Sequence, residues 1–208
     1  MNQIGKEDEK ALAPPRAWQR MLSGRRLDLL DPRPEDIEIA DIAHGLARVA
    51  RWNGQTTGTH AYSVAQHALL VESIVAEDAL EKQRDLLLGA LLHDAPEYVI
   101  GDLISPFKAA LGLDYKTFEN RLLGAIHRRF GLPEQLPDGW SRAIKSADRV
   151  AAYWEATRLA GFSIDEARLY FDQPREGAGR VPRTVIEAWP TATAQAEFLA
   201  RFAALENG

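Results

Sequence analysis

The sequence predicts an all-α fold, a helical bundle of about five core helices followed by a C-terminal helix. In most segments after Pro34, apolar residues recur at the spacing that places them on one face of a helix. No segment shows the alternation of apolar and polar residues that is typical of a half-buried strand. The chain of 208 residues is 46% hydrophobic, enough for one sizeable core. We therefore expect residues 18–208 to form a single domain.

The N-terminal segment has a different composition. Residues 1–17 are rich in charged side chains, contain Pro14-Pro15 and offer almost nothing to bury, so we expect a mobile tail. Residues 18–30 hold scattered apolar side chains, which we expect to lie over the surface of the domain. Pro32 and Pro34 then precede the first helical pattern.

The first two helices are predicted on either side of a loop rich in Thr and Gly. Apolar spacing from Ile42 to Trp52 predicts the first helix, which Asn53-Gly54 should end. The segment Ser63-Val64-Ala65-Gln66 has the form of a capping box, so Ser63 should open the second helix. His67 lies at the flank of the apolar stripe of this second helix.

Four further segments complete the predicted bundle. A third helix should cover residues 83–95, until Pro96 interrupts it. Three long helices are predicted after it, at 115–130, 140–159 and 192–205, each with apolar residues in helical register. Residues 172–183 are expected to form a loop.

Composition excludes several classes of function. The net charge of −5 argues against a broad electrostatic grip on a nucleic-acid polymer or an anionic membrane, but not against a small phosphorylated ligand. The chain has no cysteine, which removes disulfides, thiolate metal sites and thiol catalysis, so any metal must use His, Asp and Glu. No stretch is typical of a membrane span or a signal peptide, and we expect a cytoplasmic protein.

A His-Asp pair, His93-Asp94, follows the apolar run Leu86–Leu92. Ionisable side chains next to a buried segment are costly unless something pairs with them, and a divalent metal accepts a neutral imidazole and a carboxylate together. His67 and Asp148 also have apolar neighbours and lie on two other predicted helices. Each residue alone has a simpler explanation, a core histidine or an aspartate paired with a nearby arginine. Together they are candidate ligands of one metal.

Further motifs surround these four residues. They are the pair Arg51-Trp52, the segment Ser63–His67, the segment His93–Glu97 with Glu97 at its end, and the pair Gly101-Asp102. In this order, between about Asp28 and Leu159, they resemble the HD-domain metal-dependent phosphohydrolases. Within that superfamily the sequence is similar to the bacterial YfdR-like proteins and, more distantly, to the HD-domain 5′-deoxynucleotidases. Ser105 and Phe107 depart from the Thr and Val that are usual there, which leaves the substrate preference open.

The resemblance implies a metal centre with a specific set of ligands. His67, His93, Asp94 and Asp148 would hold one divalent ion, which could be Mn, Co, Mg, Ni, Fe or Zn. Members with two metals have two more histidines between the His-Asp pair and the final Asp, where this chain has only His127. A single metal is therefore expected.

The resemblance also implies roles in catalysis and substrate binding. Glu97 would orient or deprotonate the attacking water, with Asp102 and Arg51 as further catalytic residues. The residues expected at the substrate are Arg51 at the phosphate, Trp52 at the sugar or base, Asp102 and Ser105 at the nucleoside, and Lys108 as a second cation.

The function expected from these features is removal of phosphate from a small nucleotide, first of all a (deoxy)nucleoside 5′-monophosphate. Nucleoside triphosphates and cyclic nucleotides remain open as substrates. A different possibility is a regulatory module that binds metal and nucleotide without turnover. A purely structural helical protein would leave the His-Asp pair without a charge partner. The resemblance also suggests a homodimer.

Overall fold

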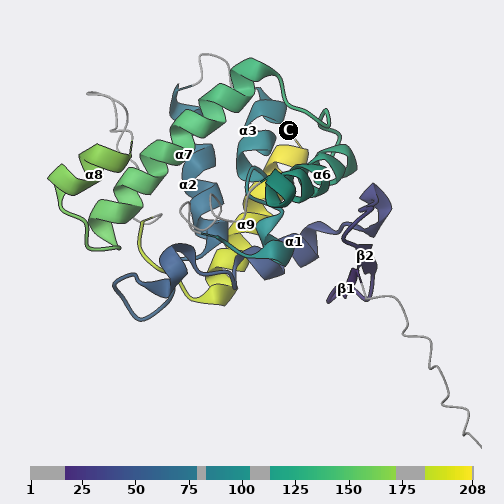
Figure 1. Cartoon of the computed structure of the whole chain (residues 1–208), viewed down its shortest axis with the longest axis horizontal. Helices are drawn as coiled ribbons and strands as arrows, with labels where there is room; N and C mark the ends of the chain where they lie inside the picture. Colours follow the sequence, from purple (N-terminus) through teal and green to yellow (C-terminus); the bar gives the residue numbers. More distant parts are fainter. Residues whose placement is uncertain (1–16, 79–82, 104–112, 172–185, 208) are drawn as a thin grey trace, which may run out of the picture.

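Helices dominate the described part of the chain, which confirms the predicted all-α fold. The computed structural model describes residues 17–78, 83–103, 113–171 and 186–207, so nearly all of the expected tail and the loop at 172–183 lie outside it. Within these ranges no helix is both long and apolar enough to cross a membrane. The elements in chain order are β1 (Trp18–Arg20), β2 (Arg26–Asp28), η1 (Pro34–Asp36), α1 (Ile39–Leu46), η2 (Arg51–Gly54), α2 (Val64–Asp78), α3 (Arg84–Leu91), α4 (Glu97–Ile100), α6 (Leu113–Arg129), α7 (Asp138–Arg158), α8 (Ile164–Tyr170) and α9 (Thr191–Glu206) (Figure 1).

Helix α2 is the centre of the bundle. It packs against α7, α3 and α9, and α1 lies beside it (Figure 1). The apolar stripe of α2, formed by Val64, Ala68, Val71 and Val75, is buried in these contacts. Because α2 and α7 pack directly on each other, polar side chains on their facing sides meet inside the protein.

Ser63 precedes α2, as its sequence pattern predicts. Its hydroxyl accepts a hydrogen bond from the backbone N–H of Gln66 at 3.3 Å. The side chain of Gln66 does not complete a capping box, because it donates to the carbonyl of Glu187 and accepts from the backbone N–H of Trp189. Gln66 instead ties the start of α2 to the segment before α9.

The prediction of one helix from Ile42 to Trp52 is wrong at its C-terminal end. Helix α1 ends at Leu46, and the chain then pairs with the residues before α2 through an isolated bridge between Ala50 and Ser63. Trp52 follows in the short helix η2 with a left-handed backbone, φ 58°. Tertiary contacts of this segment outweigh its helical spacing, and they bring Arg51 and Trp52 to the start of α2.

The predicted third helix, 83–95, is also too long, because α3 ends at Leu91 and turns occupy residues 92–96. The physical reason is Pro96. A proline has no N–H to donate to the carbonyl four residues earlier, here that of Leu92, and its ring clashes with that carbonyl. His93 and Asp94 therefore lie in a turn after the helix, and α4 begins after the proline.

The hairpin of β1 and β2 and the helix α8 were not predicted. Residues 18–28 form an antiparallel hairpin of two three-residue strands, which are too short to show an alternating pattern. Asp41 on α1 anchors the hairpin turn, because its carboxylate accepts hydrogen bonds from the backbone N–H and the hydroxyl of Ser23 at 2.9 and 2.6 Å. Helix α8 begins at a capping box formed by Ser163 and Glu166.

Candidate metal centre

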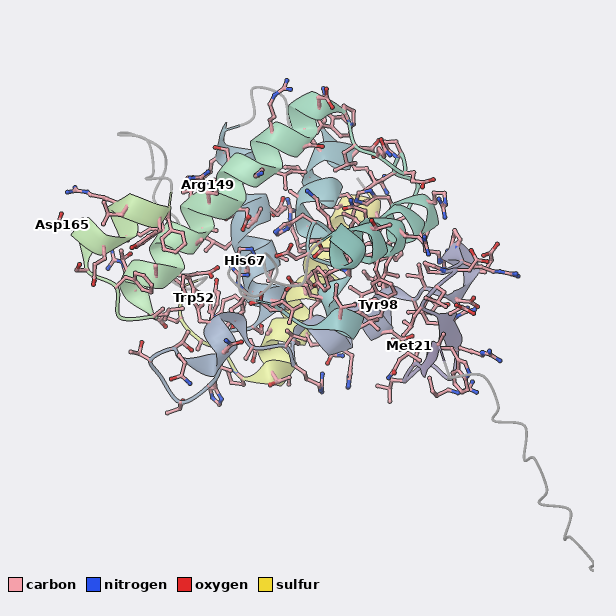
Figure 2. All side chains as sticks on the ribbon, viewed as in Figure 1. Met21, Trp52, His67, Tyr98, Arg149 and Asp165 are labelled. Carbon is pink, nitrogen blue, oxygen red and sulfur yellow. The ribbon has the colours of Figure 1, made fainter. Side chains whose placement is uncertain are left out.

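Two imidazoles and a carboxylate converge where α2, α7 and the turn after α3 meet. His67 comes from α2, His93 from the turn and Asp148 from α7. One ligand atom from each of these residues lies within 4.8 Å of the other two. His67 Nε2 is 3.1 Å from Asp148 Oδ1, and the two imidazole rings are 5.2 Å apart between centroids. Figure 2 shows His67 near the middle of the molecule, beneath α7.

Asp94, the fourth expected ligand, lies in the same cluster. Its Oδ2 is 3.2 Å from His93 Nε2 and 3.4 Å from His67 Nε2. Asp94 is not one of the three residues His67, His93 and Asp148 whose ligand atoms lie closest together, but the Asp94 carboxylate contacts both imidazoles. The structure thus brings together all four residues that the sequence motif assigns to a metal.

Both imidazoles direct Nε2 toward these carboxylates. His93 donates from Nδ1 to the carbonyl of Ala90 at 2.8 Å, and His67 Nδ1 faces Glu155 Oε1 at 2.6 Å. Among the described residues, neither Nε2 atom has an aligned hydrogen-bond partner, although both are buried. Buried polar atoms without partners are rare and unfavourable. A divalent cation bound by neutral imidazoles and carboxylates would satisfy both nitrogens, so the residues present fit such a group.

The electrostatics of the cluster favour a positive charge at this point. Burial and the Arg51 cation oppose a charge on His67, but Glu155, Asp148 and Asp94 outweigh them and raise its pKa well above the usual range. Burial also opposes the charge on Asp94 and Asp148, yet the adjacent histidines hold both pKa values below normal. The carboxylates are therefore ionised at neutral pH, the state in which they bind metals.

Glu155 belongs to the site although no sequence motif points to it. It is fully buried on α7, and its Oε2 accepts hydrogen bonds from Trp52 Nε1 at 2.9 Å and from Arg51 Nε and Nη2 at 3.3 Å each. Burial opposes its charge, but Arg51 and His67 lower its pKa. A signal was present in the sequence, because Glu155 follows Asp148 by seven residues and thus lies on the same face of the helix.

Arg51, Trp52 and Asp102 are brought together beside this cluster. Arg51 Nη1 is 3.4 Å from Asp102 Oδ2, so carboxylates contact both ends of the guanidinium. Burial disfavours the Arg51 charge, but Glu155 and Asp102 raise its pKa above normal. The Trp52 ring packs against Phe162 and Phe171, with centroids 5.7 and 5.8 Å away. Trp52 therefore joins η2 to the two ends of α8, contacts that were not predicted.

Glu97 begins α4, one turn after Asp94, and is 1% exposed. Its backbone N–H donates to the carbonyl of Asp94 at 3.0 Å, which fixes its position relative to the cluster. Helix α4 packs against α1 at Gly45, where an added Cβ would lie 2.7 Å from Tyr98 Cβ. The absence of a side chain there allows α4 to approach α1. Ser105 and Lys108, the other expected substrate contacts, lie outside the described residues.

The chain is similar to two known proteins, and both are described as uncharacterized. An uncharacterized protein of Rhodobacter capsulatus is 62% identical over 159 residues, which are 76% of this chain and 81% of that protein. The uncharacterized protein YfdR of Escherichia coli K12 is 35% identical over 136 residues, which are 65% of this chain and 67% of YfdR. No protein-family model matches the chain.

Proposed function

The chain belongs to the family of the Escherichia coli protein YfdR, and we propose that it is an HD-type, metal-dependent phosphohydrolase that removes phosphate from a small nucleotide. One observation carries the metal part of this proposal. The buried Nε2 atoms of His67 and His93 face the carboxylates of Asp94 and Asp148, without an aligned hydrogen-bond partner among the described residues. Imidazole nitrogens and carboxylates in such an arrangement are the ligand set of a divalent cation.

The four ligands would come from three elements, which fixes the site rigidly in the bundle. His67 lies on α2, Asp148 on α7, and His93 and Asp94 in the turn after α3. A divalent cation there supplies Lewis-acid polarisation of a phosphoryl oxygen and makes water more acidic. Phosphate-ester hydrolysis is among the slowest uncatalysed reactions, so this contribution is needed in addition to positioning.

Glu97 is the candidate general base. Its carboxylate is almost wholly buried, and it starts a short helix one turn after Asp94. A buried carboxylate next to a metal centre can orient a water molecule and take up its proton as the water attacks phosphorus. Asp94 is the nearest ligand in the chain, so the turn through Pro96 sets the relative position of base and ligands.

Arg51 is the candidate phosphate-binding residue, since a guanidinium matches the geometry of a phosphate group. Its contacts of 3.3–3.4 Å with Glu155 and Asp102 hold it beside the cluster. A phosphate group would compete with Asp102 for Nη1. The nucleotide part of the proposal is supported by the resemblance of Arg51-Trp52 and Gly101-Asp102 to family motifs, and a nucleoside 5′-monophosphate is the first candidate.

The direct experiment is a screen of substrates combined with metal analysis of the same sample. Purified protein is incubated with nucleoside monophosphates, triphosphates and cyclic nucleotides, each with Mn²⁺, Co²⁺ or Mg²⁺, and released phosphate is measured. We expect metal-dependent release from at least one nucleoside 5′-monophosphate. Protein that contains a bound metal but releases phosphate from none of these compounds would contradict the proposal.

A second candidate is a binding module that holds a metal and a nucleotide without turnover. The observation in its favour is that Arg51 already contacts two carboxylates, so a free guanidinium is not presented to a phosphate group. The two candidates differ in the fate of the ligand. A regulatory module would leave a bound nucleotide intact for hours in the presence of metal, whereas a hydrolase would not.

A further inference from the structure

The carboxylate of Glu155 divides its two oxygens between two different sets of donors. Oε1 lies 2.6 Å from His67 Nδ1. Oε2 accepts hydrogen bonds from the Trp52 indole at 2.9 Å and from the Arg51 guanidinium at 3.3 Å. The side chain of Glu155 has no exposed surface, so solvent does not compete for these contacts.

This contact determines which nitrogen of His67 is offered to a metal. A neutral imidazole carries one proton, and a metal binds the nitrogen that lacks it. An ionised carboxylate has no proton to donate, so Nδ1 must carry the proton where it faces Glu155. When a metal takes the place of a proton on Nε2, the lone pair of Nε2 would be available to the ion beside Asp94 and Asp148.

We propose that Glu155 is a positioning residue of the metal centre, which selects the metal-binding form of His67 by accepting its Nδ1 proton in a hydrogen bond. Metal-ligating histidines commonly use their second nitrogen in this way, and loss of the partner lowers metal affinity about 10–100-fold. The inference rests on the metal-binding part of the proposed function and does not require hydrolysis.

The second oxygen explains why a carboxylate is needed rather than an amide. Arg51 and Trp52 can only donate hydrogen bonds, so Glu155 must be an acceptor on both sides. Glutamine at this position has one accepting and one donating end. The donors of Arg51 and Trp52 would keep the amide oxygen, and the amide N–H would face His67. His67 would then accept at Nδ1 and carry its proton on Nε2, the nitrogen that the metal needs.

The alternative is that Glu155 merely neutralises the buried Arg51. The substitution Glu155→Gln keeps the shape of the side chain but removes both its charge and its acceptor at His67, so the two roles are separated by which nitrogen of His67 binds the metal. Glu72→Gln is the matched control. Glu72 is also buried and paired with an arginine, Arg201, and it lies on α2 like His67, but its partner belongs to α9.

The test uses metal ions alone as the probe. Isothermal titration of wild-type protein, Glu155→Gln and Glu72→Gln with Mn²⁺ or Co²⁺ should show about 10–100-fold weaker binding only for Glu155→Gln. Equal affinity in wild type and Glu155→Gln would overturn the inference. Weaker binding to the same extent in Glu72→Gln would also overturn it, because the effect would then be a general loss of packing.

A spectroscopic measurement on the wild-type protein does not depend on the variant folding. In long-range ¹H–¹⁵N spectra of the Zn²⁺-loaded protein, His67 should show a protonated Nδ1 and a metal-bound Nε2. His93 is an internal reference, since the Ala90 carbonyl fixes its Nδ1 proton independently of Glu155. Metal binding through Nδ1 of His67 would refute the inference. Metal binding as described but without phosphate release would refute the proposed hydrolase and leave the role of Glu155 intact.

Discussion

His67 and Asp148 meet across the interface between α2 and α7, with His67 Nε2 3.1 Å from Asp148 Oδ1. The two residues are far apart in the chain, so their contact exists only when the two helices are packed. His93 adds a third element to the same point. A cation bound there would join three segments of the folded protein and would find no equivalent site in the unfolded chain.

Metal binding should therefore stabilise the fold. At a hundredfold excess of Mn²⁺ over its dissociation constant, the free energy of unfolding should rise by about 2.7 kcal/mol. For a protein of this size, Tm should increase by about 5–10 °C. Thermal unfolding with Mn²⁺ and with EDTA measures this difference. His93→Gln should abolish the increase, while His60→Gln, at an exposed position, should retain it. A full increase in His93→Gln would show that the stabilising ion binds elsewhere.

Substitution of Glu97 should remove turnover alone, whereas substitution of Asp94 should remove both metal binding and turnover. Glu97→Gln should bind metal with wild-type affinity but lose about 10²–10⁴-fold in turnover, because the proposed base is gone and the ligands remain. Asp94→Asn should lose both metal and turnover. The measurements are kcat with the best nucleotide and metal content after dialysis. Wild-type turnover in Glu97→Gln would exclude its assignment as the base.

Loss of Arg51 should destabilise the protein through Glu155. Arg51→Ala leaves a fully buried carboxylate without its cation, which in buried pairs costs about 3–5 kcal/mol. Arg201→Ala is the matched control, since Arg201 is 36% exposed and solvent can replace part of its contact with Glu72. Unfolding in urea should show a clearly smaller loss for Arg201→Ala. Equal losses would mean that the burial of the Arg51 pair is not the determining factor.

His127 should make stability depend on pH in the acidic range. Burial lowers the pKa of His127, partly opposed by hydrogen bonds to the carbonyls of Glu134 and Pro133. Because the pKa in the folded state lies below the value of about 6.5 in the unfolded chain, the unfolded state takes up the proton first. The contribution of His127 to the free energy of unfolding is therefore complete above about pH 6.5. It falls as the pH drops toward the folded-state pKa of His127, by at most about 1.4 kcal/mol per pH unit.

Urea unfolding between pH 7.5 and 5 in EDTA measures this slope. His127→Gln should reduce the slope, because it removes the titrating group. The other titrating groups are common to wild type and His127→Gln, so the difference between the two slopes isolates His127. An identical slope in wild type and His127→Gln would show that His127 takes up its proton equally well in the folded protein.

Much of the bundle could be predicted from the sequence because long helices have many repeats of the apolar pattern. The helices predicted at 115–130, 140–159 and 192–205 correspond to α6, α7 and α9 within a few residues. The metal-site motif also identified four residues that the structure places together. The helices could be predicted because their apolar pattern is local, and the four site residues could be predicted because their order along the chain matches a known motif.

The features that were not predicted depend mostly on tertiary contacts. Glu155 looks like an ordinary helical glutamate in the sequence, and its role appears only when Trp52 turns out of the helical conformation and meets it. The early end of α3 could have been predicted from the sequence, because a proline disturbs the helical turn that precedes it. The hairpin at residues 18–28 could not be predicted in this way. Each strand has only three residues, and the turn between them is held by a contact with Asp41 on α1.

The most direct test of the central claim is a crystal structure of the protein grown with Mn²⁺, with anomalous diffraction data to locate the ion. We predict one strong anomalous peak in contact with Nε2 of His67, Nε2 of His93 and the carboxylates of Asp94 and Asp148. A Mn²⁺ ion bound at a different place, or full Mn²⁺ binding in solution that survives replacement of both histidines, would contradict the claim.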